Sequence, residues 1–203
     1  MQRTRRGLKV TAAVLLALAL AYLAVAVPAF VFPAATAPQD IERADVVFVI
    51  GPPADARIDT ALDLIHVGKA DALMVSLDPE AEAYEKAQSA CAEGVEGVKV
   101  LCARPEPFTT QGEARWLRTE SEARGWDSAA VITFTPHLTR ARAITEQCFG
   151  GELAMVDSEQ ELEPYYWAYM FAYQSGAFVK MWLKGGCGDG SGLADAGVTE
   201  IAR

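Results

Sequence analysis

The amino-acid sequence predicts an α/β protein: a doubly wound, mainly parallel sheet of five strands with helices on both faces, behind one N-terminal transmembrane helix. Three observations predict this class. A long apolar segment opens the chain, strand-length apolar runs then alternate five times with segments of helical periodicity, and these runs lack the polar alternation of strands with a solvated face. We therefore expect parallel strands joined by right-handed crossovers.

The N-terminal segment is long enough to cross a membrane. Between Leu8 and Phe32 the only charged residue is Lys9, and roughly 20 apolar residues suffice to span about 30 Å of hydrocarbon. Three further basic residues precede it: Arg3, Arg5 and Arg6. The first acidic residue is Asp40. Because cytoplasmic flanks are rich in Lys and Arg, we expect a cytoplasmic N-terminus and an extracytoplasmic domain after Pro33.

A cleaved signal peptide is the alternative. It has the same basic start, but its apolar region usually covers only about 7–15 residues. Ala35-Thr36-Ala37 has the form of a cleavage site, although Pro38 follows it directly. The expected organisation is a cytoplasmic basic tip and anchor (1–33), a linker (34–43), an α/β domain (44–184) and a glycine-rich tail (185–203), flexible past Cys187.

The charge distribution excludes one class of partner. After the anchor, 14 basic and 27 acidic residues remain, and so acidic a surface repels phosphate backbones. We expect no nucleic-acid binding. The chain has no C-x-x-C and only two histidines, so no zinc site is expected. Walker A, G-x-S-x-G and H-E-x-x-H motifs are missing, and no cluster of Asp and Glu has the spacing of a metal site.

Four cysteines follow the anchor: Cys91, Cys102, Cys148 and Cys187. An even number in an oxidising compartment suggests disulfides. Proximity along the chain favours Cys91–Cys102 and Cys148–Cys187, one of three possible connectivities. Buried free thiols are the alternative.

The expected strands are 44–50, 73–76, 98–101, 129–134 and 153–156. The expected helices are 57–69, 80–91, 110–124, 137–148 and 161–182. The last of these carries eight aromatic residues between Tyr165 and Trp182. Such a segment can be a helix on the membrane surface, but a helix laid on the sheet is the favoured interpretation.

Ligands of doubly wound sheets bind beyond the carboxyl ends of the strands. At the first such loop, Gly51 permits a sharp turn. Arg57 follows in the first helical turn, where a cation opposes the helix dipole and an anionic ligand would relieve this. A solvated surface arginine is the alternative.

Two further loops carry polar residues. Thr110 and Glu113 have the spacing of a capping box, which would account for both without a ligand. Thr133 ends a strand, Thr135 and Pro136 fit the start of a helix, and His137 then lies in its first turn. There the dipole lowers the pKa of the imidazole, so a neutral His137 could be a general base, with Arg140 one turn on as an anion ligand. A structural histidine is the alternative.

Together these loops resemble the bacterial family of YdcF-, SanA- and ElyC-like proteins, which carry a Rossmann-like domain, often behind one transmembrane helix. The matching pieces are Val46 to Gly51, Arg57, Gly68-Lys69-Ala70, Leu73 to Ser76, Thr110, Glu113-Ala114, Ile132-Thr133, His137 and Arg140-Ala141. They cover roughly residues 44–183. Two features differ from the family pattern: the glycine-rich turn is Gly51-Pro52-Pro53, and Ser76 is followed by Leu77-Asp78 without the usual glycine.

The resemblance implies a role in cell-envelope biogenesis or barrier function. It suggests a pocket in which Arg57 and Arg140 hold an anionic, for example phosphorylated, precursor, with His137 as acid/base and Glu113 orienting it or a substrate hydroxyl. Gly51, Thr110 and Thr133 would complete the ligand-binding set. No cofactor is expected, because S-adenosylmethionine, which is associated with some members, is not expected outside the membrane. The competing hypothesis is a non-enzymatic scaffold that contacts envelope partners through the anchor and the aromatic helix.

Overall fold

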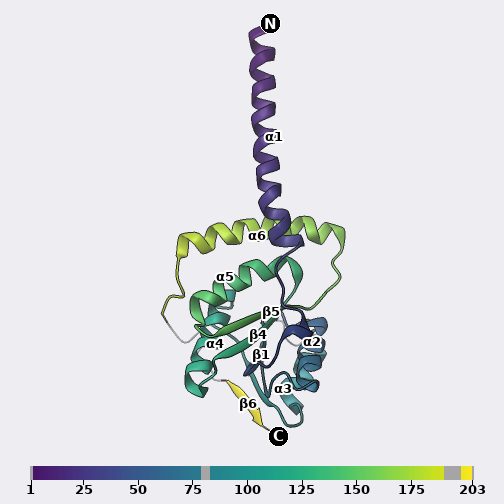
Figure 1. Ribbon diagram of the computed structural model, residues 1–203, viewed down its shortest axis with the longest axis vertical. Coiled ribbons are helices and arrows are strands. Elements are labelled where there is room, and N and C mark those ends of the chain that lie inside the picture. The colour runs from purple at the N-terminus through teal and green to yellow at the C-terminus, as the bar shows by residue number, and fades with distance from the viewer. Residues whose placement is uncertain (1, 79–82, 190–197, 203) are drawn as a thin grey trace.

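The computed structural model describes residues 2–78, 83–189 and 198–202 and shows a long helix that projects from an α/β domain (Figure 1). Helix α1 (Gln2–Val31) contains an apolar stretch, Gly7–Val31, that is long enough to cross a membrane. Its length and composition fit both a membrane anchor and a signal sequence. The predicted N-terminal apolar helix is therefore present.

The sheet has six strands rather than the predicted five. They are β1 (Val46–Val49), β2 (Ala72–Ser76), β3 (Lys99–Ala103), β4 (Ser128–Thr133), β5 (Glu152–Asp157) and β6 (Thr199–Ala202), in the order β5-β4-β1-β2-β3-β6. The first five are parallel, as predicted, and β6 pairs antiparallel with β3. The prediction of a flexible tail was wrong at its end, because Glu200 of β6 pairs with Lys99 and Arg124. Residues 190–197 of that tail lie outside the described part.

Helices cover both faces of the sheet. The helices next to the strands are α2 (Asp55–His66), α3 (Glu85–Glu93), α4 (Thr110–Arg124) and α5 (Leu138–Cys148). Side chains alternate along each strand, so Val47 packs in one core cluster with Ile58 of α2, and Phe48 in the other with Trp116 of α4. The burial of both faces explains why the strands are continuously apolar.

The last helix, α6 (Pro164–Lys184), was predicted to lie on the sheet, and this prediction was wrong. The helix packs on α5, on the short 3-10 helix η3 (Thr135–His137) and on the foot of α1. Within α6 only Met170 and Gln174 are buried. The sheet faces are already covered by α2 to α5, so α6 lies outside that layer.

Both predicted disulfides are confirmed: Cys91 is bonded to Cys102, and Cys148 to Cys187. The predicted linker is fastened to the domain. The Thr36 amide donates to the Met155 carbonyl (2.7 Å), and a second 3-10 helix, η1 (Pro38–Asp40), leads to a buried Ile41.

Candidate functional site

The candidate site lies where the strand order reverses, at the carboxyl ends of β1 and β4. Because β1 pairs with β2 on one side and with β4 on the other, the chain leaves these two central strands toward opposite faces. Gly51 follows β1, and Thr133 ends β4. The fold thus brings residues from three separate loops to one edge of the sheet.

The start of α4 differs from the predicted capping box. Thr109, not Thr110, is the N-cap, and its hydroxyl accepts a hydrogen bond from the Gly112 amide (3.1 Å). A Cβ at Gly112 would lie 2.1 Å from the Pro107 carbonyl oxygen, so only glycine fits there. Because Thr109 caps the helix, the side chains of Thr110 and Glu113 are free to turn toward the site.

Glu113 is buried and joins α4 to the loop after β1. Its Oε1 accepts a hydrogen bond from the Gly51 amide (2.6 Å). Burial raises the pKa of Glu113, opposed by the Ser76 hydroxyl, the Gly51 amide and the nearby guanidinium of Arg57. Gly51 does not have a left-handed backbone conformation, and a Cβ there would come within 2.8 Å of the outer end of the Phe108 ring, which would have to shift.

His137 is held between two threonines. It ends η3 and precedes the first residue of α5, whereas we expected it inside the first turn of a helix capped by Thr135. Its Nδ1 lies 3.0 Å from Thr133 Oγ1, and its Nε2 lies 3.3 Å from Thr110 Oγ1. Burial, then the charges of Arg140 and Arg57, lower its pKa well below the usual value. Burial therefore favours the neutral imidazole.

Two guanidinium groups are buried beside it. Arg57 is 2% exposed, donates to the Ile50 carbonyl (3.0 Å) and lies over the Phe134 ring, while its Nε has no partner. Burial lowers its pKa to about 10. Arg140 is 8% exposed and donates to Gln174 Oε1 (2.7 Å) and to Thr110 Oγ1 (3.4 Å).

A cavity of about 460 Å³ lies beside this network, between the start of α4, α5 and α6. Of the predicted site residues, Thr110 and Arg140 line it; Arg57, Glu113 and His137 are buried and do not line this cavity. The lining residues are Phe108, Thr109, Thr110, Gln111, Arg140, Ile144, Gln147, Ala172, Tyr173, Gly176, Ala177, Lys180, Met181, Lys184 and Gly186. The cavity thus combines an apolar wall with cationic side chains.

Sequence reasoning missed the contribution of α6. Gln174 fixes Arg140, Tyr173 lies under its guanidinium (5.9 Å), and Lys180 and Lys184 line the cavity. One signal was present: Gln174 is a polar residue within an aromatic helix and aligns with Met170, one turn earlier.

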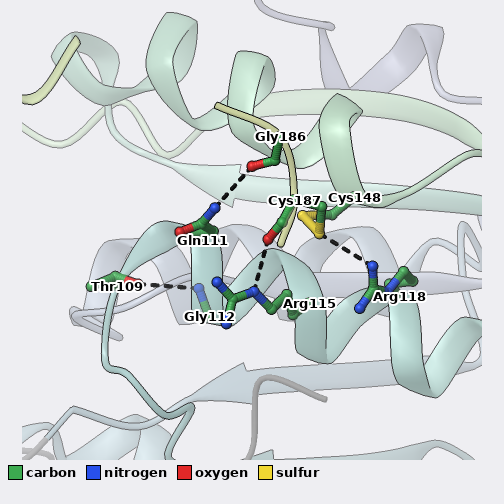
Figure 2. Close-up of a disulfide and its surroundings, with 8 residues drawn as sticks. All are labelled: Thr109, Gln111, Gly112, Arg115, Arg118, Cys148, Gly186 and Cys187. Carbon is green, nitrogen blue, oxygen red and sulfur yellow. Dashed lines mark hydrogen bonds between the residues drawn. A yellow bond between two sulfur atoms is a disulfide. The ribbon is translucent and has the colours of Figure 1, made fainter. Parts of the chain in front are cut away.

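A disulfide lies next to Gly186, one of the residues that line the cavity (Figure 2). Cys187, just after α6, is bonded to Cys148 at the end of α5. The Cys187 carbonyl accepts from Arg115 Nε (2.8 Å), and the Gly186 carbonyl accepts from Gln111 Nε2 (2.9 Å). Three elements, α4, α5 and the segment after α6, are thereby tied together at one side of the cavity.

No group of three or more potential metal ligands occurs among the described residues. Comparisons with protein-family models, with curated proteins and with solved structures found no match for this chain.

Proposed function

We propose that this protein is anchored in the cell membrane by α1, with its domain on the extracytoplasmic side. There it acts in cell-envelope biogenesis or barrier maintenance by binding or processing a small anionic precursor, for example a phosphorylated one. We also propose that the chain is related to the YdcF-, SanA- and ElyC-like proteins and shares their Rossmann-like arrangement, with five parallel strands. Two disulfides support an oxidising compartment.

The observation that carries the proposal is a buried excess of positive charge. Arg57 and Arg140 are both buried. Glu113 is a buried carboxylate whose charge acts on both guanidinium groups. Neither guanidinium forms a salt bridge within the described part of the chain. Glu113 can offset only one of these two positive charges, and an uncompensated buried charge is costly, so an anion bound at Arg140 would stabilise the site.

We assign separate roles to the polar residues of the site. Arg140 faces the cavity and, with Lys180 and Lys184, provides the anion ligands. Thr110 lies between Arg140 and His137, so a ligand oxygen at Arg140 also meets the Thr110 hydroxyl. The neutral His137 can accept a proton passed through that hydroxyl. Glu113 positions the loop at Gly51.

The alternative is a non-enzymatic envelope scaffold, and one observation favours it. Both ring nitrogens of His137 are already within hydrogen-bonding distance of threonine hydroxyls. Such a histidine can serve structure alone. If a His137→Gln variant bound anions normally and fully restored the envelope of a deletion strain, the scaffold would be the better description.

The anion site is tested by calorimetric titration of the full chain in detergent micelles with inorganic phosphate and pyrophosphate. We expect Arg140→Gln to weaken binding by about 10- to 100-fold, because a hydrogen bond to a charged group contributes about 1.5–3 kcal/mol. Arg142→Gln is the matched control. Arg142 is on the same helix but pairs with Glu146 and the Ala34 carbonyl, so its loss should leave binding unchanged. Equal affinities in all three proteins would refute the proposed site.

A further inference from the structure

Helix α6 carries a surface that the fold leaves uncovered. Residues at helical spacing form one stripe of exposed side chains: Tyr165, Ala168, Val179 and Leu183, with Trp182 beside Val179, one turn on. They lie opposite the buried Met170 and Gln174. Tyr165, Trp182 and Leu183 are 76%, 77% and 83% exposed. So many large apolar side chains on one helix face mark an interaction surface.

The charge of α6 sets it apart from the rest of the domain. Its 21 residues include no Asp or Glu, although the chain has 27 of them. Its only charged residues are Lys180 and Lys184, which lie on the flank that lines the cavity. Aromatic and aliphatic residues with lysines at the side, and no carboxylate, are typical of helices at a membrane surface.

The position of α6 fits the same occupant. Figure 1 shows α6 running crosswise at the foot of α1, on the side of the domain from which α1 leaves. Phe30 of α1 packs edge-on against Phe171 (ring centroids 5.4 Å apart), and the Tyr22 hydroxyl lies 2.8 Å from Ser175 Oγ. These contacts use one flank of α6 and leave its outward stripe facing along α1.

The length of α1 indicates how deep α6 lies relative to the membrane. The 25 residues Gly7–Val31 extend for about 37 Å at about 1.5 Å per residue, whereas a bilayer core is about 30 Å thick. The last turns of α1 therefore reach the headgroup region. Among the residues of α1 from Gly7 onward, Ala26 and Phe30 in those turns are the buried ones.

We infer that α6 is an interfacial helix whose outward stripe lies in the leaflet of the membrane on the domain's side. This inference depends on α1 spanning the membrane, as proposed above, but not on the anion site. It places the cavity directly below the lipid headgroups, with Lys180 and Lys184 at the boundary.

The test is quenching of tryptophan fluorescence by lipids brominated on the acyl chains, with the full chain reconstituted in phosphatidylcholine–phosphatidylglycerol vesicles. We expect strong quenching of the wild-type protein and loss of most of it in Trp182→Phe. Trp126→Phe is the control: Trp126 adjoins β4 at the opposite end of the sheet, so this variant should be quenched like the wild type.

Two outcomes would overturn the inference. Quenching that is equal in wild-type and Trp182→Phe proteins would place Trp182 outside the bilayer. If Trp182 were shielded from both brominated lipid and aqueous acrylamide, a second copy or another protein would cover α6 instead. Because neither readout uses an anionic ligand, failure of the anion site would leave this result unaffected.

Discussion

At the scale of single residues, burial decides the chemistry of this site. His137 lies between Thr133 and Thr110. Burial away from water lowers the pKa of His137 and raises the pKa of Glu113. A neutral imidazole and a carboxylate with raised proton affinity are the states such surroundings favour. These states follow from contacts between loops that are 27 to 62 residues apart in the chain.

The depressed pKa of His137 predicts a pH dependence of stability. Below the usual histidine pKa of about 6.5, the unfolded chain binds a proton that the folded state refuses, so stability falls as the pH falls toward the lower folded pKa. The contribution is at most about 1.4 kcal/mol per pH unit. Denaturant unfolding between pH 7.5 and 5 should show this slope in the wild type, and His137→Gln should lack it. Parallel pH profiles for the two proteins would contradict a neutral buried His137.

At the scale of elements, one turn at the start of α4 controls which side chains enter the site. With Thr109 as cap, the backbone from Pro107 to Gly112 folds so tightly that the Gly112 Cα approaches the Pro107 carbonyl. This places Thr110 beside His137 and Glu113 beside Gly51. Had Thr110 been the cap, its hydroxyl would be bonded to the first turn of the helix and would not be available to a ligand.

We therefore expect Gly112→Ala to be destabilising. The added methyl would overlap the Pro107 carbonyl, and such overpacking costs about 1–3 kcal/mol. Gly150→Ala is the control, because a Cβ there meets no atom within 4 Å. Thermal unfolding of both variants should show a lowered midpoint for Gly112→Ala alone. An unchanged midpoint would mean that the turn is looser than described.

At the scale of the whole molecule, several contacts between distant segments of the chain surround the cavity. The sheet holds β1 and β4 side by side, α6 bridges α1 and α5, and the Cys148–Cys187 bond lies next to Gly186 of the cavity lining. By contrast, Cys91–Cys102 links α3 to β3, whose neighbour at the sheet edge is β6. The two disulfides thus act in different parts of the fold.

The double variant Cys148→Ser/Cys187→Ser should lose about 2–5 kcal/mol of stability and bind phosphate more weakly. Its disulfide closes a segment of 39 residues, against 11 for Cys91–Cys102, so removing the latter should cost about 1 kcal/mol less and leave anion binding intact. Guanidinium unfolding and calorimetry measure the two effects. Equal loss of anion binding in both double variants would show that the Cys148–Cys187 bond has no specific role at the cavity.

The sequence alone determined the class of fold, its five parallel strands and its helices. Continuous apolar runs such as 129–134 and helical periodicity such as 110–124 reflect local burial, which is written into residue order, and the cysteine pairs followed from proximity. The N-terminal apolar helix was equally visible in the run from Leu8 to Phe32. Those features depend on nearest neighbours and on the hydrophobic effect, which composition reports directly.

Tertiary structure decided the cap of α4, the place of α6 and the pairing of β6. Thr109 and Thr110 are equally good caps by residue type, and only the close approach of Gly112 to Pro107 selects between them. The two faces of the sheet were filled by α2 to α5, which left α6 outside. Glu200 of β6 forms salt bridges with Lys99 and Arg124, which are distant in the sequence. Each outcome depends on competition for space between distant segments, which no local pattern records.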